Sequence, residues 1–343
     1  MLGRWAPDGR HIITVADYHV RMTVWSLITR TCAYINGPKF SDKGLSFSPD
    51  GSFMALAERR DCKDSVAVFS CGDWSAVTRF AVQTSDLADL AWSPDGSCIA
   101  VWDTILDYKV LVYSPEGECM ASYKAYGDAL GVKGVSWSPS GQLLAVGSYD
   151  EQARLLNHVT WTPLKELRHT PRVEGPYGCV VYREVVEVTR SSSGGGGKYE
   201  DGAVRSRYAV AELPASVRTE KPPLDKPNPK LGVGTMKWSH DGKFIATRND
   251  SMPGALWIWD CGELALAAVL LQDEDVVAFA WDAEGHRLAV CTGCTRVYLW
   301  SPEGASCIHV PLPSFRASNV AWSPAGASFV LTDKDAFCCA FLS

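Results

Sequence analysis

The sequence lacks a surplus of positive charge. Its 343 residues carry 33 Lys and Arg against 39 Asp and Glu, which gives a formal net charge of −6 at pH 7. Proteins that bind nucleic acid nonspecifically carry a basic domain or stripe, so this balance argues against such binding. No run of 18 apolar residues occurs, and no apolar core follows Met1. The sequence therefore predicts neither a membrane-spanning helix nor a signal peptide.

Motifs for nucleophilic and nucleotide chemistry are also missing. Neither Gly-x-Ser-x-Gly nor Gly-x-x-x-x-Gly-Lys-Ser/Thr occurs. Ser148 follows a glycine but has no second glycine two residues on, so we expect it to make loop hydrogen bonds. Cys291 and Cys294 have metal-ligand spacing, but a structural zinc site needs four ligands and no second Cys-x-x-Cys pair exists. The sequence predicts no enzyme, no cofactor and no metal.

The sequence is rich in cysteine, with 12 residues. Several lie inside or beside apolar runs, as at Cys98, Cys291, Cys338 and Cys339. With no signal peptide expected, we interpret them as small reduced hydrophobic residues in the cytoplasm.

What the sequence has is a repeat. Trp137-Ser138-Pro139-Ser140-Gly141 followed by the apolar run 143–146 is typical of a strand, a tight turn and a second strand. Successive copies begin 41 to 45 residues apart, except for one interval of 101, and a period of about 40–45 residues is that of WD40 propeller blades. The seven copies begin at Trp5, Phe47, Trp92, Trp137, Trp238, Trp281 and Trp322.

Each turn is followed by an apolar second strand and then a third, often ending in an aromatic residue. We expect second strands at 12–15, 53–57, 99–102, 143–146, 244–247, 288–291 and 329–331, and third strands at 23–25, 66–69, 110–113, 154–157, 256–259, 297–300 and 337–341. Their runs are continuous because neighbouring blades bury both faces. The 13 Trp fit the wedges between blades. The fold class is therefore all-β, a WD40-type propeller of about seven four-stranded blades over residues 1–343.

Two parts of the chain depart from this plan. Only four residues precede Trp5, and the chain stops after a third strand. We therefore expect an N-terminally shortened form whose ring is incompletely closed, the alternative being closure by apolar contact. The long interval predicts an insertion over 172–230 with a flexible Ser/Gly tract at 191–197 and a proline-rich run. Its β-prone pieces, 180–188 and 208–213, could pair as a hairpin, extend the outer edge of blade four, or belong to a hidden eighth blade.

The loops between second and third strands lie on one face of a propeller, where partners commonly bind. The segment 58–64 packs six charges and a cysteine into seven residues. It is either a solvated loop whose ion pairs contribute little, or a rim that offers Arg59 and Arg60 to a partner. The predicted partner-binding residues on this face are Arg59, Arg60, Asp61, Lys63, Asp64, Asp107, Tyr108, Tyr149, Asp150, Arg248, Asn249 and Asp250.

Six strings within these repeats resemble WD repeat-containing protein 8, a centrosomal and spindle-pole family: residues 55–64, 100–104, 145–150, 156–161, 228–230 and 246–250. The resemblance spans nearly the whole chain. It implies a noncatalytic scaffold in the cytoplasm and cytoskeleton, at the centrosome or spindle pole body, which supports minus-end anchoring of microtubules and spindle organisation. The partners it implies are a coiled-coil anchoring protein of the SSX-interacting type, a kinesin-14 motor and γ-tubulin-associated proteins, with no nucleic acid and no membrane.

Two other classes of function remain open at this point. The same turn sequence occurs in the accessory propellers of prolyl-oligopeptidase-like hydrolases, although this chain has no room for a catalytic domain. The other is a translation-factor propeller that binds ribosomal RNA, which the acidic net charge disfavours.

Overall fold

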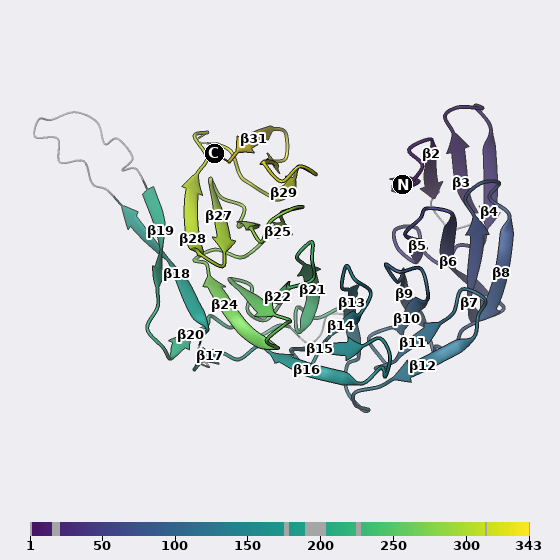
Figure 1. Ribbon diagram of the computed structural model, residues 1–343, viewed down its shortest axis with the longest axis horizontal. Coiled ribbons are helices and arrows are strands. Elements are labelled where there is room, and N and C mark those ends of the chain that lie inside the picture. Colours follow the sequence, from purple (N-terminus) through teal and green to yellow (C-terminus); the bar gives the residue numbers. More distant parts are fainter. Residues whose placement is uncertain are drawn as a thin grey trace, which may run out of the picture. The chain divides into compact units, whose positions relative to one another are not determined.

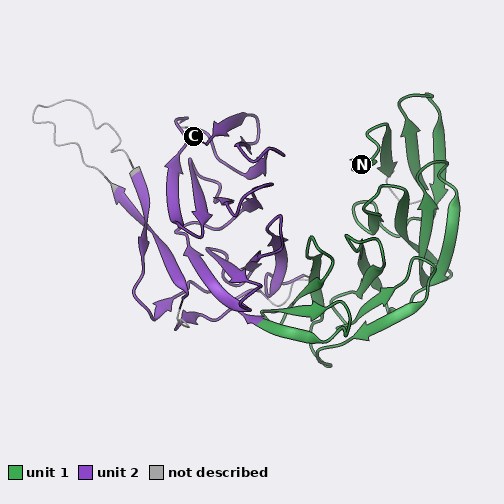
Figure 2. Ribbon diagram, in the orientation of Figure 1, with its two compact units in different colours: residues 1–166 green, residues 167–343 purple. Residues whose placement is uncertain are grey.

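The computed structural model describes residues 2–15, 21–174, 178–188, 204–223, 228–312 and 314–342. It forms two compact units, residues 1–166 and residues 167–343, coloured separately in Figure 2. The described residues are strands and turns, as Figure 1 shows, so the all-β prediction is confirmed. None of them forms a helix long and apolar enough to cross a bilayer.

Unit 1 carries the first four blades. Their strands are β1 (Leu2–Trp5), β2 (His11–Val15), β3 (Arg21–Ser26), β4 (Cys32–Asn36), β5 (Leu45–Phe47), β6 (Phe53–Arg60), β7 (Lys63–Ser70), β8 (Ala76–Ala81), β9 (Leu87–Trp92), β10 (Ile99–Asp103), β11 (Val110–Tyr113), β12 (Cys119–Tyr123), β13 (Val132–Trp137), β14 (Leu143–Ser148), β15 (Gln152–Asn157) and β16 (Pro163–Arg168). Each consecutive set of four forms one sheet in chain order.

Unit 2 carries three more blades and the insertion. The blade strands are β21 (Val233–Trp238), β22 (Phe244–Asn249), β23 (Ala255–Asp260), β24 (Ala265–Leu271), β25 (Ala278–Trp281), β26 (Leu288–Cys291), β27 (Arg296–Ser301), β28 (Gly304–His309), β29 (Asn319–Trp322), β30 (Ser328–Thr332) and β31 (Phe337–Phe341). The last sheet, β29-β30-β31, has three strands among the described residues. The seven predicted second strands and the seven predicted third strands are all present, and most are longer than expected.

The repeated turn is held by its own side chains. In the third blade the hydroxyl of Ser93 accepts the backbone N–H of Cys98 at 3.0 Å and donates to Asp95 Oδ1 at 2.6 Å. Gly96 follows at a φ of 78°, which L side chains rarely adopt. The same serine-to-backbone bond recurs at Ser48, Ser138 and Ser239. The turn sequence therefore closes each first hairpin through local chemistry.

The tryptophan that ends a first strand joins its blade to the preceding one. In unit 1, the indole N–H of Trp137 donates to the carbonyl oxygen of Ala91 at 3.3 Å. In unit 2, Trp281 donates to Lys237 at 2.8 Å and Trp322 to Ala280 at 2.9 Å. Between the sheets, apolar side chains of neighbouring blades form continuous clusters, such as the one around Phe279, Leu288 and Tyr298. This lateral packing buries both faces of the inner strands.

The insertion contributes β17 (Arg172–Val173), β18 (Val180–Val188), β19 (Val204–Val210) and β20 (Ala215–Ser216). β18 and β19 pair as an antiparallel hairpin, and β18 also pairs in parallel with β24. The edge that they extend therefore belongs to the fifth blade, not to the fourth as suggested from the sequence. Glu184 secures the hairpin, because its buried carboxylate accepts the Tyr298 hydroxyl at 2.7 Å and lies 3.3 Å from Arg296. The Ser/Gly tract at 191–197 lies outside the described residues.

The first blade leaves one sheet face uncovered in unit 1. Trp5 and Trp25 are 61% and 48% exposed, and Tyr34 on the same face is 54% exposed. The opposite face, including Ile13, packs against the second blade. The expectation that tryptophans fill the wedges between blades is thus wrong for these two, although it holds for residues such as Trp92 and Trp281.

Candidate docking surface

The charged segment of the second blade is the tip of a hairpin. The sequence predicted a loop over 58–64, but β6 continues to Arg60 and β7 begins at Lys63. Only Asp61 and Cys62 form the turn, with φ of 50° and 59°, as expected for a two-residue type I′ hairpin. Burial does not follow strand alternation here, because the cross-strand partners Arg59 and Asp64 share a face, yet Arg59 is exposed and Asp64 is buried.

Two carboxylates of the hairpin are buried. The Glu58 side chain is fully buried and accepts two bonds from Arg79, at 2.7 Å and 3.1 Å. Asp64 accepts the backbone N–H of Leu87 at 2.6 Å and lies 3.0 Å from Lys39 Nζ. Buried charges need such partners. Asp64 therefore joins the second blade to the third, and its carboxylate cannot present itself to a partner as the sequence predicted.

Asp86 extends this network to the surface. Its Oδ1 accepts Lys39 Nζ at 2.7 Å and Arg59 Nη1 at 2.6 Å. Burial raises the pKa of Asp86, but the two cations outweigh it, so the pKa lies below its ordinary value. The Arg59 side chain remains 41% exposed while its guanidinium is oriented by Asp86. Arg60, Asp61 and Lys63 are exposed at the same tip.

The loop of the third blade is tied to the same segment. Asp103 is buried and accepts the backbone N–H groups of Ser85 and Asp86, both at 2.7 Å. Tyr108 is only 1% exposed, and burial raises its pKa, so its ring is part of the core rather than a contact residue. Asp107 is half-buried between Lys109 and Lys124, at 3.1 Å and 3.2 Å.

Sequence reasoning missed one exposed apolar side chain in this loop. Leu106 is 83% exposed and stands between Ile105 and Asp107. The signal was an apolar residue in a charged loop, where no strand pattern requires it. A single exposed leucine is common on protein surfaces, but this one lies in a loop whose Thr104 N–H donates to the carbonyl oxygen of Asp86 at 2.9 Å. The surface formed by Arg59, Arg60, Asp61, Lys63 and Leu106 is called the hairpin-tip surface below.

The fourth blade places its predicted residues mostly inward. Tyr149 is 7% exposed, which removes it from the set of contact residues. Asp150 pairs with Arg154 Nη2 at 2.5 Å, and the side chain of Arg154 is itself only 7% exposed. These residues therefore stabilise the blade, and only the 24% exposed Asp150 carboxylate reaches solvent.

In unit 2, the predicted contact residues are Arg248, Asn249 and Asp250, and they too are partly or fully buried. Arg248 donates to the carbonyl oxygen of Val276 at 2.8 Å and lies 3.3 Å from Asp250. Asn249 is fully buried, and its side-chain oxygen accepts the Ser251 N–H at 3.2 Å. The prediction is therefore corrected for Asn249, as for Asp64, Tyr108 and Tyr149, because buried side chains cannot contact a partner. For the other eight residues it stays a prediction.

A buried polar cluster in the fifth blade also escaped sequence reasoning. The Thr247 hydroxyl accepts the Trp259 indole N–H at 2.9 Å and lies 2.7 Å from His169 Nε2. These contacts tie the buried His169 ring to the fifth blade, and which of the two groups donates depends on the tautomer of the imidazole. His169 lies 78 positions from Thr247, across the insertion, so no local spacing could reveal the contact.

The family profile "WD domain, G-beta repeat" matches residues 117–157. Among solved structures, a chain of a mitotic checkpoint complex crystal structure aligns with TM-score 0.57 at 13% identity, covering 99% of this chain and 89% of that one. The Myceliophteria thermophila Cps50 (Swd1) β-propeller domain aligns with TM-score 0.55 at 11% identity, covering 100% and 97%. These likenesses concern the fold alone, and they confirm the propeller class.

Two curated relatives match almost the whole chain. An uncharacterized WD repeat-containing protein of Schizosaccharomyces pombe is 24% identical over 98% of this chain and 71% of its own length. The mouse WD repeat-containing protein WRAP73 is 44% identical over 98% of this chain and 75% of its own length. The assignment made from the sequence is corrected by this match, which names WRAP73 and not WD repeat-containing protein 8. WD40 propellers are generally noncatalytic scaffolds, and this chain is of that type. It belongs to the family of WD repeat-containing protein WRAP73.

Proposed function

We propose that the protein is a docking scaffold that binds a coiled-coil partner through its hairpin-tip surface. The observation that carries this proposal is the network that orients Arg59: Asp86 holds the guanidinium, and Asp103 holds the backbone of Asp86. An arginine already ordered before binding loses less conformational entropy on docking. Arginine is also among the residues that contribute most to interfaces.

The chemistry of the surface fits the side of a coiled coil. Such helices expose Glu and Lys at the positions that flank their apolar seam. Arg60 and Lys63 offer positive charge to acidic residues of this kind, and Leu106 offers an apolar contact beside them. Exposed pairs contribute little individually, so several must act together with the apolar contact.

The cellular setting belongs to the same proposal. We infer a cytoplasmic site at the centrosome or spindle pole, with a coiled-coil anchoring protein of the SSX-interacting type as the partner. A kinesin-14 motor and γ-tubulin-associated proteins would join through that complex, supporting minus-end anchoring and spindle organisation. Fluorescence microscopy of the tagged chain in dividing cells tests this location, and a uniform distribution through mitosis would contradict it.

The docking experiment compares the wild type with the double variant Arg60→Glu/Lys63→Glu. Both side chains are exposed and flank the turn, and the melting temperature of the variant is measured first because Arg60 Nε lies 3.7 Å from the buried Glu58 carboxylate. Tagged proteins are purified from dividing cells, and the coiled-coil proteins retained are quantified by mass spectrometry. We expect recovery to fall at least about tenfold, which corresponds to about 1.4 kcal/mol.

The matched control is Arg172→Glu in unit 2, whose side chain is 63% exposed. It changes the net charge in the same direction but lies outside the hairpin-tip surface. Equal recovery of coiled-coil proteins by the double variant and the wild type would refute the proposal. An equal loss with Arg172→Glu would show that general charge, and not this surface, governs binding.

A further inference from the structure

Two neighbouring repeats depart from the common turn sequence in a related way. The second position of the turn is proline in five of the seven copies, but it is His240 in the fifth. The residue after the turn glycine is His286 in the sixth copy and is not histidine in any other copy. Both changes fall on the same kind of turn, in blades whose strands pack together within unit 2.

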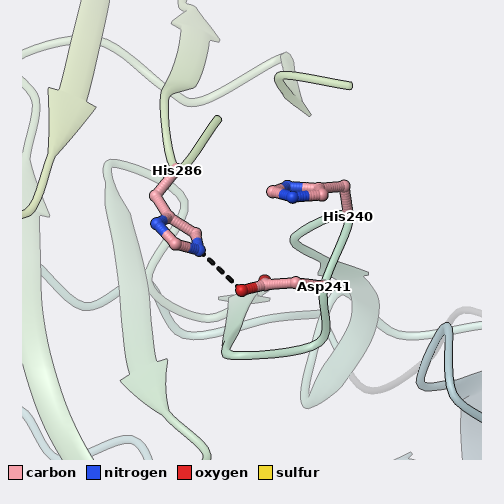
Figure 3. Close-up of side chains that lie close together, drawn as sticks. All are labelled: His240, Asp241 and His286. Carbon is pink, nitrogen blue, oxygen red and sulfur yellow. Dashed lines mark hydrogen bonds and ion pairs between the residues drawn. The ribbon is translucent and has the colours of Figure 1, made fainter. Parts of the chain in front are cut away.

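The fold brings these two turns together, as Figure 3 shows. His286 Nε2 lies 2.7 Å from Asp241 Oδ2, and the rings of His240 and His286 are 5.6 Å apart, tilted by 33°. One nitrogen or oxygen from each of His240, Asp241 and His286 lies within 4.8 Å of the others. Among the described residues, this is the group of three that could hold a metal ion.

The carboxylate of this cluster is oriented before any ligand arrives. Asp241 Oδ1 accepts the Ser239 hydroxyl at 2.8 Å and the Lys243 backbone N–H at 3.0 Å, which directs Oδ2 toward His286. Burial raises the pKa of Asp241, but the His286 ring and these two donors outweigh it, so the pKa lies well below its ordinary value. The His286 ring is held edge-on against Phe244, with centroids 5.3 Å apart.

We propose that His240, Asp241 and His286 bind a divalent transition-metal ion, with Zn²⁺ as the ion that the donor set fits. Two imidazoles and one carboxylate suit zinc, whereas Mg²⁺ and Ca²⁺ prefer all-oxygen sites. With bonds of about 2.0–2.1 Å, tetrahedral ligand atoms stand about 3.3 Å apart. The Asp241–His286 pair opens slightly to reach this spacing, and exposed His240 closes onto the ion by rotating its side chain. Water takes the fourth position.

The bound ion would link the first turns of the fifth and sixth blades. Two of its ligands lie on one turn and the third on the next, so binding cross-links residues 241 and 286 through side chains that already touch. The prediction of no metal rested on cysteine spacing alone. Asp241 and His286 are 45 residues apart in sequence and meet only because the two blades stack. The expected effect is a folded state that is more stable with zinc than without it.

The test is a titration of the chelator-treated full chain with zinc, followed by isothermal calorimetry and by the melting temperature. We expect one saturable site and a rise in melting temperature with zinc. His240→Ala and His286→Ala should each weaken binding by at least about tenfold, since even the loss of outer-shell partners costs about 10–100-fold. His240→Ala alters an exposed side chain, so it keeps the test decisive if His286→Ala folds poorly.

The matched control is His11→Ala. His11 occupies the corresponding turn of the first blade, with Nδ1 2.5 Å from Asp8, but it is not part of a three-ligand group among the described residues. It should leave binding unchanged. Cobalt added in place of zinc should give a spectrum without thiolate charge transfer, which separates this site from binding to exposed cysteines. No saturable binding by the wild type, or wild-type affinity in His240→Ala, would overturn the proposal.

Discussion

Replacing Asp64 by alanine should destabilise unit 1 without touching its exterior. The carboxylate is 2% exposed, accepts the backbone N–H of Leu87 at 2.6 Å, and lies 3.0 Å from the equally buried Lys39. Asp64→Ala leaves that N–H without its acceptor and removes one of two anions from the lysine. The change therefore acts at the junction of the second and third blades.

The expected magnitude follows from these contacts. Breaking a buried ion pair by removing one partner costs about 3–5 kcal/mol. Lys39 keeps Asp86 at 2.7 Å and the carbonyl oxygen of Leu87 at 2.6 Å, so we expect the lower end, about 3 kcal/mol. Melting temperatures of domains of about 150–250 residues shift by about 2–4 °C per kcal/mol, so unit 1 should melt about 6–12 °C lower.

Thermal unfolding followed by circular dichroism measures the change, with Lys63→Ala as the control. Lys63 is exposed on the same hairpin, so its replacement should alter the free energy of unfolding by less than about 0.5 kcal/mol. Adding Lys39→Met to Asp64→Ala removes both charges, and the double loss should be smaller than the sum of the single ones. If Asp64→Ala and Lys63→Ala have the same melting temperature, the Asp64 carboxylate does not hold the second and third blades together.

Three further outcomes test other parts of the fold. Gly131→Ala should cost about 1–3 kcal/mol in urea unfolding, because a Cβ there would lie 2.6 Å from a backbone oxygen, whereas Gly127→Ala, with open space around it, should not. His169→Ala should cost about 1–3 kcal/mol by removing a hydrogen-bond partner of the buried Thr247 hydroxyl, and wild-type stability would contradict the assigned cluster. Burial, with two nearby carboxylates, raises the pKa of Cys71 to about 11. Iodoacetamide should therefore label exposed Cys62 well before Cys71 at pH 8 by mass spectrometry, with Cys71 labelling rising toward pH 11.

The blades could be predicted because their signals are local. A turn such as Ser93–Gly96 carries its own hydrogen bonds and its own left-handed glycine, so a turn of this sequence can form the same hairpin in different blades. The exposed docking residues were harder to predict. Their burial depends on contacts from distant parts of the chain, and so Asp64, held by Lys39 and the Leu87 N–H, is buried while Lys63, one residue away, is exposed.

The amino-acid sequence by itself determined the number of repeats, the all-β class and the inserted strand at 180–188, because each depends on residues a few positions apart. The second inserted strand, predicted at 208–213, is β19 at Val204–Val210. Only the tertiary structure decided which side chains meet. It placed the inserted hairpin on the fifth blade, brought His169 to Thr247 across 78 positions, and set two histidine-bearing turns side by side. Such contacts arise from the stacking of one sheet on the next, and the register of that stacking is set by packing over whole faces rather than by any short pattern.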